Sequence, residues 1–140
     1  MATPSARPTE TILIVDDEIQ VLALVAELLR TQGYVVMSTW DPDEALRFAR
    51  AHTGSIHLLL SDLVMPVMTG PELATEIRAI HPKMKVLFMS AYSTELVEDY
   101  GVRLGSGEPF LVKPFGLAEL KSKVRAVLDY RSPFLRPRAK

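Results

Sequence analysis

The chain contains no cysteine among its 140 residues. The absence of cysteine excludes disulfides, thiolate catalysis and cysteine-based metal sites. No apolar run approaches the ~18 residues that a membrane span needs, so we expect no contact with a membrane. Residues 1–10 lack the apolar stretch of a secretory signal peptide, which makes the cytoplasm the expected location.

A strong excess of charge of either sign is also missing. The 16 basic and 17 acidic residues give a net charge of −1, which argues against a nucleic-acid-binding surface. Apolar residues make up 48% of the chain, enough for the core of one domain. We expect a flexible tail at 1–10, a folded domain at 11–130 and a basic tail or linker at 131–140.

Five short apolar runs alternate with stretches of helical periodicity. Such runs are typical of strands buried on both faces of a parallel sheet, and we expect them at 11–15, 34–38, 56–61, 86–89 and 110–112. Helices are predicted from 19 to 32, from 41 onward, from 69 to about 80 and from about 117 to 127. The segment 93–107 contains three glycines and predicts only a short or irregular helix.

Capping residues mark the ends of these helices. Asp41 is expected to cap the second helix, with Pro42 in its first turn and Glu44 completing a capping box. Gly33 is expected to end the first helix, and Arg125 in the last helix to face water. The alternating order predicts an α/β fold with a parallel sheet, in which ligands bind beyond the carboxyl ends of the strands.

Polar residues stand at the carboxyl ends of four predicted strands: Asp16 and Asp17, then Asp62, Ser90 and Lys113. Two carboxylates ~4 Å apart repel by about 4 kcal/mol at an effective dielectric constant of about 20, so three together need a proton or a cation. Oxygen ligands favour a hard cation, and Mg²⁺ is usual where a phosphate is bound as well.

The lysine and the serine complement these carboxylates. Lys113 could neutralise one carboxylate at rest and later bind a phosphate oxygen, and Ser90 could donate a hydrogen bond to a phosphoryl group. A carboxylate that attacks a phosphoryl group would give an acyl phosphate, and Asp62 is the candidate nucleophile.

In this order and spacing, the motifs resemble the receiver domain of two-component response regulators. The similarity covers about residues 11–130 and rests on Asp16-Asp17, the run 62–70, Ser90-Ala91 and Lys113-Pro114-Phe115. It implies a flavodoxin-like (βα)₅ three-layer sandwich with strand order 2-1-3-4-5. The patterns at 70–73 and 107–110 are more similar to receivers fused to hybrid sensor kinases.

The resemblance implies a role for each acidic position. Asp62 would accept a phosphoryl group from a histidine kinase or a histidine phosphotransfer protein. Mg²⁺ would be bound by Asp17, Asp62 and the backbone carbonyl of Val64, while Asp16 would act through water. Lys113 would bind the phosphate and form a cis bond to Pro114.

The resemblance also implies a conformational switch, made of Ser90 and Phe110; the less favoured alternative is that Phe110 is an ordinary core residue. Val64 and Tyr92 each lie two residues after a site residue, and we expect them to slow hydrolysis of the phosphoryl group. The ten residues after 130 are too few for an output domain, so output would pass through a partner, a phosphorelay or another part of a longer chain.

Two other functions compete with the phosphoaccepting switch. A Mg²⁺-dependent phosphohydrolase would use an Asp-x-Asp pair, but Val64 stands two residues after Asp62. A receiver-like protein that binds partners without phosphorylation would not need Asp17, Asp62 and Lys113, which are all present. We therefore expect a protein that catalyses only its own phosphotransfer and slow dephosphorylation.

Overall fold

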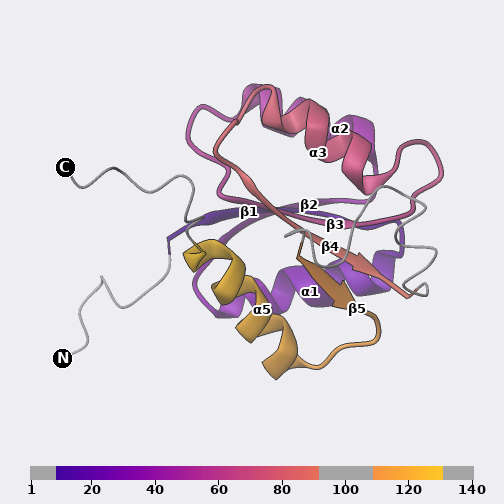
Figure 1. The fold of residues 1–140 in the computed structure, drawn as a ribbon, viewed down its shortest axis with the longest axis vertical. Coiled ribbons are helices and arrows are strands. Elements are labelled where there is room, and N and C mark those ends of the chain that lie inside the picture. Colours follow the sequence, from indigo (N-terminus) through magenta and orange to yellow (C-terminus); the bar gives the residue numbers. More distant parts are fainter. Residues whose placement is uncertain (1–8, 92–108, 131–140) are drawn as a thin grey trace.

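The computed structural model describes residues 9–91 and 109–130, which form one parallel five-stranded sheet in the order β2-β1-β3-β4-β5 (Figure 1). The predicted flavodoxin-like α/β fold and its strand order are confirmed. The expected irregular helix at 93–107 lies outside the described residues, as does Tyr92.

The elements match the predicted order with small shifts at their ends. The strands are β1 (Thr11–Val15), β2 (Val35–Thr39), β3 (Leu58–Asp62), β4 (Lys85–Ser90) and β5 (Phe110–Val112). The helices are α1 (Ile19–Thr31), α2 (Pro42–Ala51), α3 (Gly70–Arg78) and α5 (Leu117–Asp129). Among residues 9–91 and 109–130, no helix combines the length and the apolar character that crossing a membrane requires.

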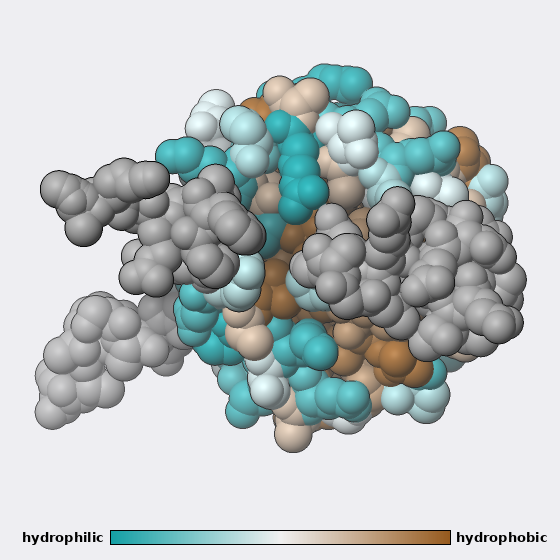
Figure 2. Space-filling model, in the orientation of Figure 1, coloured by the Kyte–Doolittle hydropathy of each residue, from teal (hydrophilic) through white to brown (hydrophobic). Residues whose placement is uncertain are grey.

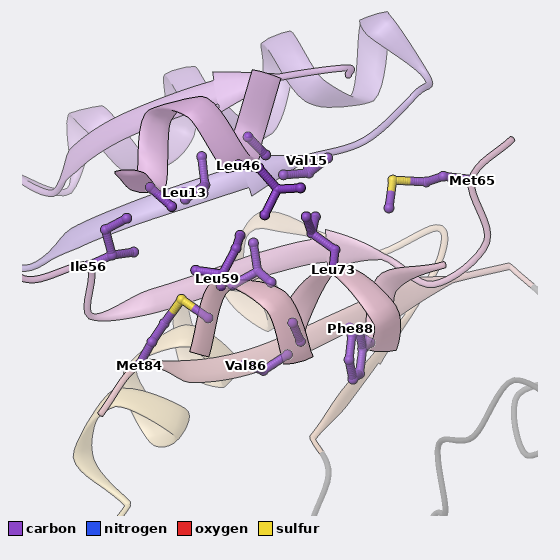
Figure 3. Close-up of a cluster of buried hydrophobic side chains, with 14 of the residues drawn as sticks. Leu13, Val15, Leu46, Ile56, Leu59, Met65, Leu73, Met84, Val86 and Phe88 are labelled. Atoms are coloured by element: carbon purple, nitrogen blue, oxygen red, sulfur yellow. The ribbon is translucent and has the colours of Figure 1, made fainter. Parts of the chain in front are cut away.

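Helices cover both faces of the sheet, with α2 and α3 on one face and α1 and α5 on the other (Figure 1). Side chains along β1 alternate between the two layers. Leu13 and Val15 join the cluster under α2 and α3, part of which Figure 3 shows, whereas Ile12 and Ile14 join the cluster with α1 and α5. All four side chains are completely buried, which explains why polar and apolar residues do not alternate along the strand.

The start of α2 differs in part from the prediction. Asp41 caps the helix as expected, because its Oδ1 accepts a hydrogen bond from the Asp43 backbone N–H at 3.0 Å. The predicted capping box is wrong. The Thr39 hydroxyl, buried at the end of β2, accepts from the Asp41 N–H at 3.0 Å and donates to the Glu44 carboxylate. The Thr39 hydroxyl therefore bridges the Asp41 N–H and the Glu44 carboxylate, which a capping box would have joined directly.

Gly33 ends α1 with a φ of 101°, as predicted for its capping role.

The two ends of the folded region are held together by contacts of Arg125. Arg125 of α5 does not simply face water, because it lies 2.7 Å from Glu10 and 2.9 Å from Asp129 and donates to the Tyr34 hydroxyl. In the orientation of Figure 1, Figure 2 shows hydrophilic residues over much of the visible surface, broken by smaller hydrophobic areas.

Candidate functional site

The register of the sheet brings the predicted site residues to one edge. Val15 pairs with Ser61, so the residues that follow them, Asp16 and Asp62, lie side by side. Ser90 ends β4 and pairs with Val112, the residue before Lys113. The carboxyl ends of β1, β3, β4 and β5 therefore supply one continuous site.

Three carboxylates meet there. Asp16, Asp17 and Asp62 each offer an oxygen, and these oxygens all lie within 4.8 Å of one another. Asp16 and Asp62 are buried, at 0% and 7% exposed, while Asp17 is open to solvent. An Mg²⁺ ion with oxygens at ~2.1 Å holds its ligands up to about 4.2 Å apart, so this all-oxygen set fits a hard cation after small adjustments.

Lys113 is the basic group of the site. Its Nζ lies 2.6 Å from Glu18 Oε1, 2.9 Å from Asp16 Oδ2 and 3.6 Å from Asp62 Oδ1. The contact with the buried Asp16 Oδ2 is close in distance but lacks hydrogen-bond geometry, which leaves that oxygen open to another donor or a cation. Burial alone would lower the pKa of Lys113, but the carboxylates of Glu18 and Asp16 outweigh it and raise the pKa.

Glu18 was not singled out in the sequence. Glu18 is the third acidic residue of the run Asp16-Asp17-Glu18, and this position could have marked it as part of the site. An acidic residue after a strand is, however, also common at the start of a helix. The Glu18 backbone N–H donates to Asp16 Oδ1 at 2.8 Å, which fixes both residues at the entry to α1.

The buried carboxyls hold their protons more tightly than usual. Burial, and then the charge of Asp16, raise the pKa of Asp62 to about 7, against the opposing effect of Lys113. Burial also raises the pKa of Asp16. Near neutral pH the metal-free site therefore retains part of a proton, which a cation would displace.

The turn after β3 fixes the position of Asp62. The Leu63 N–H donates to Asp62 Oδ1 at 3.1 Å and to the Met89 carbonyl at 2.8 Å. The Gly70 N–H then donates to the Leu63 carbonyl at 2.8 Å, which folds the start of α3 onto the end of β3. A Cβ at Gly70 would lie 2.6 Å from the Asp62 carbonyl oxygen, so only glycine fits there without a shift.

The remaining predicted site residues occupy the same edge. Val64 is half-buried within this turn, and Ser90 is 1% exposed at the end of β4. Phe110 is half-buried in β5, opposite Phe88, and packs against the core under α2 and α3. The Lys113–Pro114 bond is cis, as expected.

A family model for the response regulator receiver domain matches residues 12–125. The sensor kinase CckA of Brucella abortus is 35% identical over 122 residues, which are 85% of this chain and 12% of the kinase. The transcriptional regulatory protein PrrA of Mycobacterium tuberculosis is 39% identical over 121 residues, 86% of this chain and 50% of the regulator. The chain thus spans half or less of the length of these two relatives.

A solved relative carries ligands of the expected kind. The response regulator TrrA from Thermotoga maritima, determined in complex with Mg(2+)-BeF, is 31% identical and superposes with a TM-score of 0.67 over 85% of this chain and 99% of its own.

Proposed function

Since the chain belongs to the response regulator receiver domains of two-component systems, we propose that Asp62 accepts a phosphoryl group with the help of Mg²⁺. One observation carries the proposal: the three carboxylates of Asp16, Asp17 and Asp62 meet within 4.8 Å, beside the Lys113 ammonium. A cluster of this charge needs a cation, and a cation with a lysine forms a site for a phosphoryl group.

Asp17 and Asp62, with the backbone carbonyl of Val64, would hold the metal, and Asp16 would act through water. When bound, Mg²⁺ supplies positive charge that neutralises the phosphoryl oxygens. The Mg(2+)-BeF complex of TrrA supports the binding of magnesium by similarity.

In the phosphotransfer step, an oxygen of the ionised Asp62 attacks phosphorus. The P–O bond forms as the P–N bond of a donor phosphohistidine breaks, and the electron pair leaves with the imidazole nitrogen. Lys113 stabilises the charge on the phosphoryl oxygens, and the Ser90 hydroxyl donates a hydrogen bond to one of them.

The donor would be a histidine kinase or a histidine phosphotransfer protein in the cytoplasm. The 35% identity with CckA also supports a place within a hybrid kinase. Signalling would follow from a movement of Ser90 towards the phosphoryl group, which makes room for Phe110 to turn inward. Val64 and Tyr92 would shield the acyl phosphate from water and make its hydrolysis slow.

Intact-mass spectrometry tests the proposal. After incubation with Mg²⁺ and acetyl phosphate, the wild type and Asp43→Asn, a control at an exposed aspartate of α2, should each gain one phosphoryl group. Asp62→Asn should gain none, and a chelator should prevent the gain in the wild type and in Asp43→Asn. No adduct from any donor would favour a binding-only receiver, and rapid turnover of unrelated phosphoesters would favour a hydrolase.

A further inference from the structure

Lys113 has a second anchor that the phosphotransfer chemistry does not use. Its Nζ lies 2.6 Å from Glu18 Oε1, closer than its contacts with Asp16 at 2.9 Å and Asp62 at 3.6 Å. The ammonium therefore lies closer to Glu18 than to the proposed phosphoacceptor, with which it still forms an ion pair.

The Glu18 side chain has no local role that would account for this contact. Glu18 occupies the N-cap position of α1, yet its side chain caps no N–H group of the helix. It reaches across to the turn after β5, 95 positions along the chain. Its backbone N–H is held by Asp16 Oδ1 at 2.8 Å, so the side chain starts from a fixed point beside the site.

The contact can also be broken. The Glu18 side chain is 60% exposed, whereas that of Lys113 is 10% exposed. Exposed ion pairs contribute only roughly 1.4-fold to fivefold to an equilibrium constant. A phosphoryl group on Asp62, with close to two negative charges, competes well for the ammonium.

We infer that Glu18 is a positioning residue, which holds Lys113 away from Asp62 in the unphosphorylated protein and releases it when a phosphoryl group arrives. This inference rests on the proposed function. A cation held by Asp62, with Asp16 acting through water, weakens the pull of both carboxylates on the lysine, so Glu18 becomes its main anchor before phosphotransfer. The contact thereby lowers the affinity of the site for a phosphoryl group.

Equilibrium binding of beryllofluoride in the presence of Mg²⁺, followed by fluorine NMR, tests the role of Glu18. Glu18→Gln removes both the charge and the ion pair. Glu18→Asp keeps the charge but is one methylene too short to maintain the contact. Both variants should bind beryllofluoride roughly 1.4-fold to fivefold more tightly than the wild type. Glu27→Gln, which removes an exposed charge from the same helix, should bind like the wild type.

A second readout follows the lysine itself. In protein labelled with ¹⁵N-lysine and free of metal and beryllofluoride, the Nζ resonance of Lys113 should shift in Glu18→Gln and Glu18→Asp but not in Glu27→Gln. In the wild type, beryllofluoride with Mg²⁺ should also move this resonance, because the lysine changes partner.

Each remaining outcome counts against a specific idea. If Glu18→Asp binds like the wild type while Glu18→Gln binds more tightly, the charge acts through space and the positioning role is wrong. Unchanged or weaker binding in both variants also overturns it. A wild type that binds no beryllofluoride with Mg²⁺ overturns the proposed function instead.

Discussion

Replacing Gly70 with alanine should damage both the stability of the fold and the position of Asp62. The added Cβ would lie 2.6 Å from the Asp62 carbonyl oxygen and 2.9 Å from the Phe88 ring. Cβ atoms essentially never lie closer than 3.0 Å to a non-bonded heavy atom, so one of these groups has to move.

Neither neighbour can move freely. The Asp62 carbonyl belongs to the last residue of β3 and accepts a hydrogen bond from the Ser61 hydroxyl at 2.8 Å. The Phe88 ring is 3% exposed within the core. Overpacking of this kind costs about 1–3 kcal/mol, and we expect Gly70→Ala to lose that much free energy of unfolding.

Urea denaturation and Mg²⁺ titration by calorimetry measure the two effects. Gly54→Ala is the matched control, because the nearest atom to its Cβ is His52 Nε2 at 3.4 Å, an ordinary contact with a side chain. Its stability should stay within about 0.5 kcal/mol of the wild type. At Gly70, an equally small change with unaltered Mg²⁺ affinity would show that the turn does not constrain Asp62.

Three further predictions concern pH and the ends of the fold. The hydrogen bond from Arg125 lowers the pKa of Glu10 below its ordinary 4.5, so this carboxylate adds stability above that pH and loses its contribution as the pH falls through the lowered value. Glu10→Gln should therefore lower the free energy of unfolding by up to about 1 kcal/mol at neutral pH and leave it unchanged in acid, as measured by urea denaturation. An equal loss at the two pH values would refute the ion pair between Glu10 and Arg125. Because burial raises the pKa of Asp62 to about 7, Mg²⁺ affinity measured by calorimetry should fall by about tenfold per pH unit below that value, and a flat profile would contradict this competition. Lys85 donates hydrogen bonds to two backbone carbonyls at the end of α5, at 2.8 and 2.6 Å. Lys85→Met should therefore lower the free energy of unfolding by roughly 1–2 kcal/mol in urea denaturation, whereas Lys83→Met, at an exposed position, should change it little. Equal losses in the two variants would argue that Lys85 does not cap α5.

The fold and the main cluster of the site were predictable because they depend on short patterns. Buried strands of a parallel sheet read as uninterrupted apolar runs, and the residue after each run lies at the shared carboxyl edge. For this reason Asp16, Asp62 and Lys113 could be placed together before any distance was known. The distance of 2.9 Å between Lys113 Nζ and Asp16 Oδ2 agrees with that placement.

What sequence reasoning missed depends on contacts between elements, which the pattern within each helix or strand does not encode. The Glu44 carboxylate bonds to Thr39 rather than completing the expected box, because a strand end and a helix start converge there. Helical periodicity predicts that Arg125 faces water, but Glu10, 115 positions earlier in the chain, lies beside it. Glu18 likewise acquires its partner only when the turn after β5 meets the start of α1.

Borohydride trapping tests most directly whether Asp62 carries the phosphoryl group. Borohydride reduces an aspartyl phosphate to homoserine, which peptide mass mapping then locates in the chain. After incubation with Mg²⁺ and a phosphoryl donor, we predict homoserine at position 62 and at no other aspartate. Homoserine at Asp16 or Asp17, or a phosphorylated protein in which Asp62 is unmodified, would contradict the assignment.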